Sequence, residues 1–104
     1  TKYISNNILK IAKEIKKRSP ETQVYVQTIL PTAKSIFVES IKKINNTIKS
    51  KSSKFNFTVI DLHSHFENND GLIKKELTTD GIHLNSKGYQ VWIEIVRPLI
   101  SNLK

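Results

Sequence analysis

Hydrophobic residues recur along the first part of the chain with the spacing of an amphipathic helix. Between Tyr3 and Arg18 they fall four, three and four residues apart, which places them on one side of a helix. Pro20 cannot continue the hydrogen-bond ladder and restricts the residue before it, so the helix is predicted to end at Ser19. The apolar positions of this stripe are Ile4, Ile8, Ile11 and Ile15, with Ala12 on the same side.

Two short runs rich in β-branched and aromatic residues have the pattern of strands. The first extends from Gln23 to Ile29 and is closed by Leu30-Pro31-Thr32, and the second extends from Phe55 to Asp61 and ends in a carboxylate. A second helix is predicted between them, followed by a polar connector over residues 49–54. This helix is indicated by the apolar spacing of Phe37, Ile41, Ile44 and Ile48.

The last third is predicted to form a loop region around Asn69-Asp70-Gly71 and then a final helix, capped at Asn85-Ser86. Pro98 is expected to kink this helix or to start a last short turn. Of the helix's apolar residues, Tyr89 and Trp92 are interpreted as core anchors rather than substrate contacts. The remaining apolar positions of the helix are Ile93 and Val96.

Helices alternate with strands along the chain, and this order predicts right-handed crossovers and a parallel sheet covered by helices on both faces. Two strands alone leave an open edge and bury little apolar area. We therefore expect further strands to precede Thr1, in a separate chain or in a removed segment.

Composition fits a single small domain of 104 residues, with 38% hydrophobic and 25% charged residues, as in soluble globular proteins. No apolar run approaches the roughly 18 residues of a membrane span. The absence of cysteine excludes disulfides, thiolate metal sites and cysteine nucleophiles. The sequence leaves the cellular compartment of the protein open, and a secreted or periplasmic location in a bacterium is one of the options.

Positive charge is concentrated in the first half of the chain. Residues 1–54 hold 12 Lys or Arg against 3 Asp or Glu, a net charge of +9, whereas residues 55–104 hold 5 against 6. The lysines lie on the polar sides of the predicted helices, with a single arginine and no interleaved aromatic residues. This pattern favours solvated helix faces over a binding groove for nucleic acid or another anionic surface.

The loop before the final helix places a carboxylate and an imidazole three residues apart, at Asp80 and His83, with Gly81 available for a tight turn. In a Ser-His-Asp system the acid binds the Nδ1 proton of the imidazole and leaves Nε2 free to take the serine proton. From spacing alone, Asp-x-x-His is more typical of a loop capping arrangement than of a catalytic pair.

The run Thr79-Asp80-Gly81-Ile82-His83-Leu84-Asn85-Ser86-Lys87-Gly88-Tyr89-Gln90-Val91-Trp92 resembles the last sequence block of SGNH (GDSL-type) hydrolases. In that block, Asp-Gly-x-His-x-Asn precedes Gly-Tyr and an aromatic residue. Residues 24–32 resemble the family's fourth strand and its Leu-Pro loop, and residues 59–62 its fifth strand. The resemblance implies an α/β fold, the C-terminal part of a flavodoxin-like three-layer α/β/α sandwich with a parallel sheet. Residues 1–104 would then be the C-terminal half of one SGNH hydrolase domain.

The resemblance also implies a serine ester hydrolase in which His83 is the general base and Asp80 orients it. The family's nucleophilic serine, and the glycine and asparagine of its oxyanion hole, come from other blocks. No Gly-Asp-Ser, Gly-x-Asn-Asp or Gly-x-Ser-x-Gly occurs here. The expected partner is thus an N-terminal half carrying these groups, without which the chain is expected to be inactive. The expected substrate is an acyl ester of a sugar or lipid, as in the family's acetylesterase and platelet-activating-factor acetylhydrolase-like branches, and no cofactor is expected.

Two alternatives remain. The chain can be a noncatalytic binding or assembly module derived from this fold. It can also be a metal-dependent hydrolase, since Asp61, His63 and His65 alternate and would project to one side of an extended backbone. We prefer the interpretation that Asp61 ends a strand and that both histidines lie in a polar loop, because no fourth ligand is evident.

Overall fold

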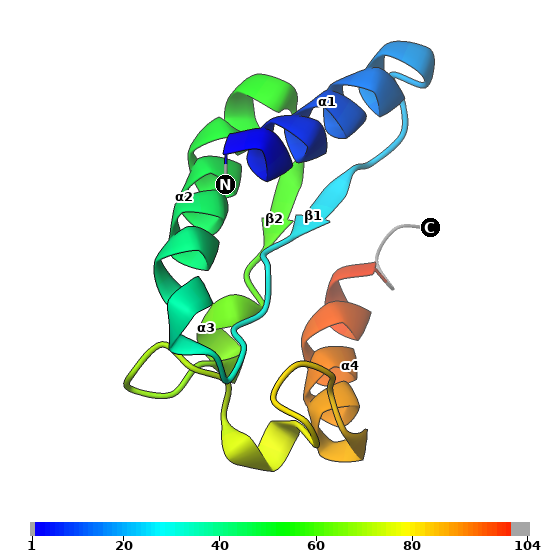
Figure 1. The fold of residues 1–104 in the computed structure, drawn as a ribbon. Coiled ribbons are helices and arrows are strands. Elements are labelled where there is room, and N and C mark those ends of the chain that lie inside the picture. The colour runs from blue at the N-terminus through cyan, green and yellow to red at the C-terminus, as the bar shows by residue number, and fades with distance from the viewer. Residues whose placement is uncertain (1, 101–104) are drawn as a thin grey trace. The chain divides into compact units, whose positions relative to one another are not determined.

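The computed structural model describes residues 2–100, which divide into two compact units. Of the described residues, the first unit contains 2–29 and 39–61, and the second contains 30–38 and 62–100. The chain therefore leaves the first unit after β1, returns to it with α2, and leaves it again after β2 (Figure 1). Each unit is described separately below.

The first unit is an α/β arrangement built on two parallel strands. Helix α1 (Lys2–Arg18) precedes β1 (Tyr25–Gln27), and α2 (Val38–Phe55) precedes β2 (Thr58–Ile60). Val26 pairs with Val59 in the parallel register, and the backbone N–H of Thr28 donates to the carbonyl of Ile60 at 3.0 Å. The predicted parallel pairing is confirmed, although both strands are shorter than the sequence pattern indicated.

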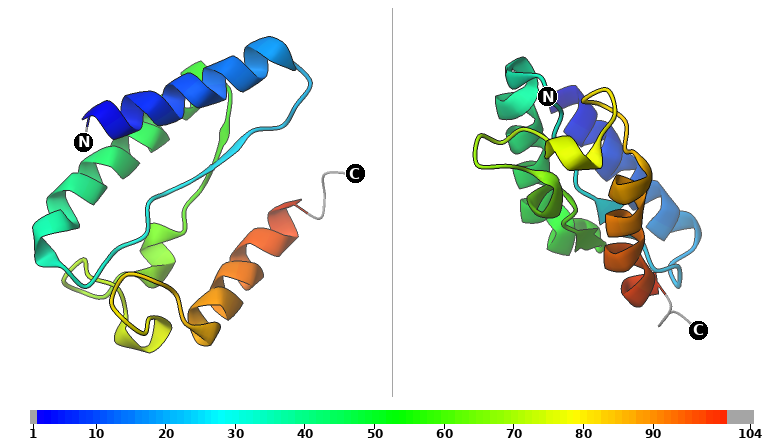
Figure 2. Two further views of the ribbon diagram at one scale, coloured as in Figure 1. Left: turned by 45° about the vertical axis from the view of Figure 1, so that its right-hand side comes forward. Right: turned by 90° about the horizontal axis from the view of Figure 1, so that it is seen from below.

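Apolar side chains from both helices, together with Phe57 just before β2, form the core of the first unit. Figures 1 and 2 show α1 and α2 next to one another and next to the strand pair. Burying these side chains contributes about 25 cal/mol for each Å² of apolar surface removed from water. The buried cluster comprises Leu9, Ala12, Ile44, Ile48 and Phe57, and the half-buried residues Val24, Val26, Ile29 and Val59 are among those that pack against it.

Helix α1 buries only part of the apolar stripe by which it was recognised, since Ala12 is buried and Ile8 is half-buried against the core cluster. Ser5, Leu9 and Ala12 face the core, whereas Ile4 is 47% exposed and Ile11 is 61% exposed. Both sets of positions keep the three-and-four spacing of one helix face, and the two faces are adjacent. Periodicity therefore identified the helix correctly but not its buried side.

Helix α2 continues to Phe55 through residues 49–54, so the predicted connector was wrong. Phe55 comes seven residues after Ile48 and packs against the same core cluster, which extends the apolar stripe by two turns. The helix ends at Asn56, whose φ of 59° is left-handed. The N–H of Phe57 donates to Ser52 and that of Asn56 to Ser53, the two bonds of a Schellman C-cap.

Asn45 is a buried polar residue on α2 that is fully used by the backbone after β1. Its Oδ1 accepts from the N–H of Ile29 at 2.7 Å, and its Nδ2 donates to the carbonyl of the same residue at 2.9 Å. The amide thus replaces a strand partner at the point where β1 has ended. This contact fixes α2 to the carboxyl end of the strand.

The second unit contains more regular structure than the predicted loop region. Helix α3 (His63–Phe66) and the 3₁₀ turns η1 (Ser35–Phe37) and η2 (Lys75–Leu77) precede α4 (Ser86–Ile100). Antiparallel bridges join Glu67 to Ile73 and Thr78 to Leu84. The fully or almost fully buried side chains of this unit include Pro31, Leu62, Phe66, Ile73, Leu77 and Val96.

Helix α4 begins at the predicted cap and runs through Pro98 to Ile100. Its polar cap is Asn85, described below. Tyr89 is 56% exposed, so its interpretation as a core anchor was wrong, whereas Trp92 is half-buried and Val96 is buried. No helix among residues 2–100 is long and apolar enough to cross a membrane.

The Asn45 contacts predict a stability difference between two neighbouring asparagines on α2. Asn45→Ala leaves the N–H and C=O of Ile29 without their partner and is expected to lower the free energy of unfolding by about 1–3 kcal/mol. Asn46→Ala, on the exposed side of the same helix, is the matched control and is expected to change it by less than about 0.5 kcal/mol. Urea unfolding of the wild-type and variant proteins measures both. Equal values for the two variants would contradict the assigned role of Asn45.

Candidate active site

The loop between η2 and α4 brings Asp80 and His83 into direct contact. Oδ2 of Asp80 lies 2.7 Å from Nδ1 of His83. Both side chains are open to solvent, with 51% of the Asp80 side chain and 79% of the His83 side chain exposed. The structure therefore brings together the two residues that the sequence indicated, and the imidazole is the more exposed of the two side chains.

The other carboxylate oxygen of Asp80 holds the turn between the two residues. Oδ1 accepts the backbone N–H of His83 at 2.8 Å and that of Ile82 at 2.9 Å. The loop capping arrangement and the Asp–His pair, weighed as alternatives from the sequence, are therefore both present. Oδ1 of Asp80 stabilises the turn, and Oδ2 contacts the imidazole ring of His83.

These contacts hold the pKa of Asp80 well below its ordinary value near 3.8. The largest cause is the hydrogen bond from the His83 backbone, followed by the bond from its imidazole and the bond from the Ile82 backbone. An ionised carboxylate can only accept hydrogen bonds, so Nδ1 of His83 must carry the shared proton. This assigns the tautomer with an unprotonated Nε2 to the neutral ring.

Thr78 ties the loop together from the other side. Its Oγ1 accepts the N–H of Gly81 at 2.9 Å and donates to the carbonyl of His83 at 2.6 Å. The hydroxyl thus links the middle of the turn to the backbone of the imidazole residue. Sequence reasoning missed Thr78, and the only signal for it was a hydroxyl residue two positions before Asp80.

Gly81 joins the dyad loop to the segment that follows β1. Its φ of +85° is in the left-handed region, and its carbonyl accepts the N–H of Ala33 at 2.8 Å. A Cβ at position 81 would lie 2.6 Å from the Cβ of Ala33, closer than side-chain carbons approach. Only glycine meets both requirements here, which agrees with the tight turn expected at this position.

Asn85 anchors the carboxyl end of the loop to α4. Its Oδ1 accepts the N–H of Gly88 at 2.8 Å, as an N-cap side chain does, and its Nδ2 donates to the carbonyl of Glu76 at 3.0 Å. Its backbone N–H donates to Leu77 at 3.1 Å. The predicted helix cap is confirmed, and it also binds the loop to η2.

The geometry supplies a proton acceptor held by a carboxylate. Nε2 of His83 can take a proton from a hydroxyl group, and the imidazolium that forms is stabilised by Asp80. Within residues 2–100, the hydrogen bonds of His83 run to Asp80 and Thr78, and none joins a serine. The described residues thus contain an imidazole positioned by a carboxylate.

The metal hypothesis required an extended backbone through Asp61, His63 and His65, and this premise is wrong. His63 and His65 lie in α3, where residues two apart project to nearly opposite sides. Nδ1 of His63 instead pairs with the carboxylate of Glu67 at 2.5 Å. No group of three His, Asp or Glu side chains suited to a metal ion occurs among residues 2–100.

A family model described as the GDSL-like lipase/acylhydrolase family matches residues 1–91. The chain belongs to that family. The match covers both units and ends within α4, after the Asp–His loop. None of the curated protein sequences compared with the chain matches it.

Three solved bacterial structures have a similar fold. A GDSL-like lipase from Bacteroides thetaiotaomicron is 17% identical with a TM-score of 0.86, covering 99% of this chain and 53% of its own. A Bacteroides fragilis protein provisionally assigned as an acylhydrolase is 22% identical with a TM-score of 0.82, covering 95% and 50%. A Streptococcus pneumonia protein provisionally assigned as a platelet activating factor is 24% identical with a TM-score of 0.79, covering 91% and 49%.

These similarities confirm the resemblance and the fold class expected from the sequence. The chain has the α/β fold with a parallel sheet that GDSL-like hydrolases share, and it spans about half the length of each solved structure. The matching family is described as one of lipases and acylhydrolases. The roles of individual residues are taken up below.

The carboxylate contacts predict how Asp80 titrates. Its pKa is lowered by folding, so the stabilisation it provides is complete above its unfolded value, about 3.9, and is lost only as the pH falls through the lower folded value. Carboxyl ¹³C NMR of the folded protein should therefore place the Asp80 midpoint below 3.8.

In His83→Ala the backbone N–H at position 83 remains, so most of the lowering is expected to persist. A return of the Asp80 midpoint to its ordinary value in this variant would mean that the imidazole, and not the backbone, controls the carboxylate.

Proposed function

We propose that this chain supplies the Asp–His part of a Ser-His-Asp triad in a serine ester hydrolase. The observation that carries the proposal is the 2.7 Å contact between Oδ2 of Asp80 and Nδ1 of His83, which leaves Nε2 unprotonated and exposed. Membership in the acylhydrolase family supports the same chemistry. In this proposal His83 is the general base and Asp80 is the residue that orients and stabilises it.

The reaction divides into acylation and deacylation. A serine hydroxyl attacks the ester carbonyl while Nε2 of His83 removes its proton, and the tetrahedral intermediate collapses as His83 returns that proton to the leaving alcohol. A water molecule then attacks the acyl-serine while His83 removes its proton. His83 returns that proton to the serine oxygen, and the acid and the free serine are released. Asp80 stays ionised throughout, which its lowered pKa favours.

The serine and the oxyanion donors would come from an N-terminal half of the same domain. The sequence lacks the family's Gly-Asp-Ser block, and the chain spans about half the length of the similar solved structures. An apolar hollow of about 380 Å³ in the first unit supports this assignment. It leaves apolar residues of α1 and β1 uncovered, and such a surface can pack against further parts of the domain. The hollow is lined by Ile8, Ile11, Ala12, Ile15, Val24, Tyr25, Val26 and Gln27.

The proposed substrate is a short acyl ester of a sugar or a lipid. The Streptococcus pneumonia structure with the same fold is assigned to platelet activating factor, and the family includes lipases. The exposed dyad is compatible with an ester carried on a large molecule, since 79% of the His83 side chain is open to solvent. Acyl transfer of this kind uses no cofactor in the proposed mechanism.

Completion of the domain is expected to switch on esterase activity. With p-nitrophenyl acetate, the 104-residue chain alone should be inactive, because it lacks the hydroxyl that His83 would deprotonate. Joined to its N-terminal half, it should turn over substrate, and His83→Ala should reduce kcat by at least about 10³-fold. Asp80→Asn should reduce kcat by about 10²–10⁴-fold through loss of the required tautomer.

Turnover by the isolated chain that disappears in His83→Ala would place a nucleophile within these residues and overturn the two-part triad. A complete domain that binds esters but never hydrolyses them would instead identify a noncatalytic module.

Thr78 is expected to act as a positioning residue in the completed domain. Thr78→Val removes the hydroxyl that joins Gly81 to His83 and should lower kcat about tenfold with little change in KM, since only the placement of the base is altered. Thr78→Ser keeps the hydroxyl and should restore kcat. Similar losses in the serine and valine variants would assign the effect to packing of the threonine methyl group.

A further inference from the structure

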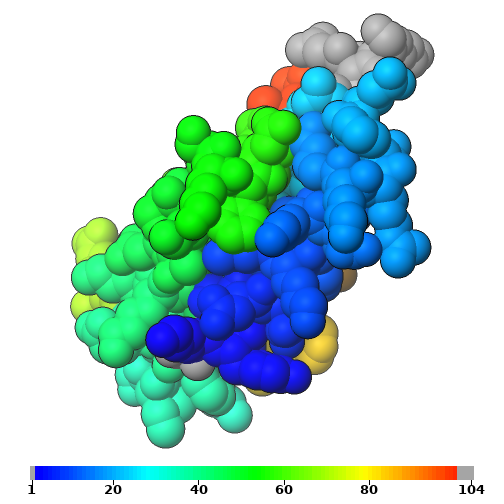
Figure 3. All heavy atoms as spheres, turned by 90° about the horizontal axis from the view of Figure 1, so that it is seen from above, coloured from blue at the N-terminus to red at the C-terminus, as the bar shows by residue number. Residues whose placement is uncertain are grey.

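A basic groove runs between α1 and α2 in the first unit, in a region that the proposed catalysis does not use. Figure 3 shows the atoms of the two helices meeting on one face. The two helices carry eleven Lys or Arg and two Glu. Two hollows, of about 530 and 260 Å³, occur where the helices approach each other.

The residues that line these hollows fall on one flank of each helix. On α1, residues 2, 6, 13 and 16 are spaced four, seven and three apart, and on α2, residues 43, 47 and 54 are spaced four and seven apart. Such spacings return to the same helix face, so both hollows lie along a single seam. The seam extends over fifteen residues of α1, from Lys2 to Lys16, about 21 Å at 1.5 Å per residue step.

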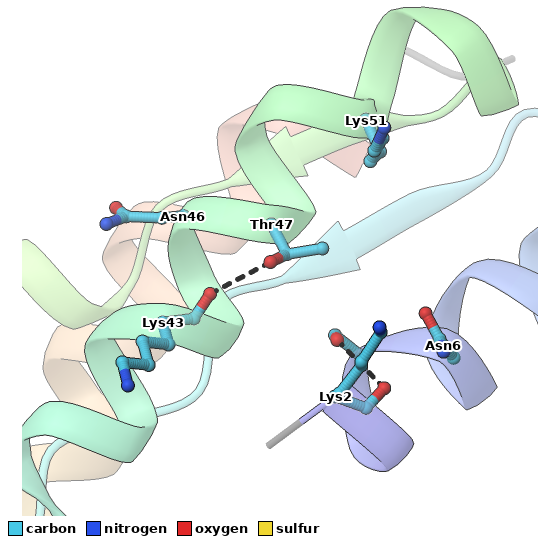
Figure 4. A pocket seen from close by; sticks show the side chains of 7 residues that line it. Lys2, Asn6, Lys43, Asn46, Thr47 and Lys51 are labelled. Atoms are coloured by element: carbon cyan, nitrogen blue, oxygen red, sulfur yellow. Dashed lines mark hydrogen bonds between the residues drawn. The ribbon is translucent and has the colours of Figure 1, made fainter.

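The larger hollow combines ammonium groups with neutral hydrogen-bonding side chains. Figure 4 shows Lys43, Thr47 and Lys51 on α2 across from Lys2 and Asn6 on α1. Thr47 Oγ1 donates to the carbonyl of Lys43 at 3.0 Å and still has a lone pair to offer. The complete lining is Lys2, Ser5, Asn6, Lys43, Asn46, Thr47 and Lys51.

The smaller hollow continues the same charge. It is lined by Lys13, Lys16, Lys54, Phe55 and Asn56, and Nζ of Lys54 lies 5.9 Å from the centroid of the Phe55 ring. Neither lining includes a carboxylate among the residues that the structure describes.

Two carboxylates near these helices form ion pairs outside the hollows. Glu14 pairs with Arg18 at 3.0 Å, and Asp61 pairs with Lys49 at 3.3 Å, and none of these four residues lines a hollow. Six lysines thus line the two hollows without a counter-charge in either lining, and their mutual repulsion is relieved when an anion binds. Because three of these lysines line each hollow, a ligand that fills the seam needs several negative charges along its length.

We propose that the α1–α2 seam binds a linear acidic polysaccharide. Lysine ammonium groups hold single carboxylate or phosphate charges, and the amide and hydroxyl groups between them suit sugar hydroxyls. Nucleic acid fits less well, since neither hollow is lined by arginine and Phe55, at one end of the seam, is the aromatic residue of the two linings, too few for stacking successive bases. The choice of polysaccharide over other polyanions rests on the proposed esterase acting on acylated sugars, whereas the anion site itself does not.

The test is binding of an oligogalacturonate, by calorimetry, to the full-length protein that carries this chain. Lys43→Glu/Lys51→Glu should weaken the affinity on the order of tenfold at low ionic strength. The matched control, Lys10→Glu/Lys42→Glu, makes the same charge change on the same helices outside both hollows and should stay within about threefold. Neutral dextran should not bind, and added salt should weaken the complex as its charges are screened.

Several results would overturn the proposed polysaccharide site. Equal losses of affinity in the two double variants would show that binding depends only on net charge. Tighter binding of oligothymidylate or of phosphatidylglycerol vesicles would assign the seam to another class of partner. Failure of oligogalacturonate to bind the wild-type protein would refute it directly. Hydrolysis of p-nitrophenyl acetate, assayed on the same preparation, separates the two hypotheses: activity without polymer binding refutes the seam alone, and polymer binding without activity refutes the esterase alone.

Discussion

The candidate site depends on the carboxylate of Asp80 making two different kinds of contact at once. One oxygen accepts two backbone N–H groups and so shapes the turn, while the other accepts the imidazole proton. Because the ring belongs to the same turn that the carboxylate stabilises, the position of His83 is set locally, within four residues. Such a unit keeps its geometry even though both side chains are largely exposed to water.

The rest of the second unit holds that short unit in place through the backbone. Thr78 closes the loop from within, and Asn85 fixes its end to both η2 and the first turn of α4. Each of these side chains satisfies backbone groups that would otherwise point into solvent or remain unpaired. The dyad is thus supported by hydrogen bonds more than by packing, in contrast to the first unit, whose apolar cluster joins its helices to its strands.

The sequence predicted those features that rest on local rules. The end of α1 near Pro20, the cap at Asn85 and the contact between Asp80 and His83 follow from residues close together in the chain. The parallel order of the strands follows from the alternation of helices and strands. The buried side of α1 did not follow from such patterns, because its choice between two adjacent apolar faces depends on where α2 lies. Likewise, the polar residues 49–54 are helical because Phe55 packs against a core that no local pattern displays.

The contact between Ala33 and Gly81 couples two positions that lie far apart in the chain. The hydrogen bond between their backbones brings them so close that a side chain at position 81 would overlap the methyl group at position 33. Any residue larger than alanine at position 33 would press on the same space, and no change at position 81 could create room, since glycine is already the smallest residue. The size of the side chain at position 33, in the segment after β1, is therefore limited by a turn that lies almost fifty residues later in the sequence.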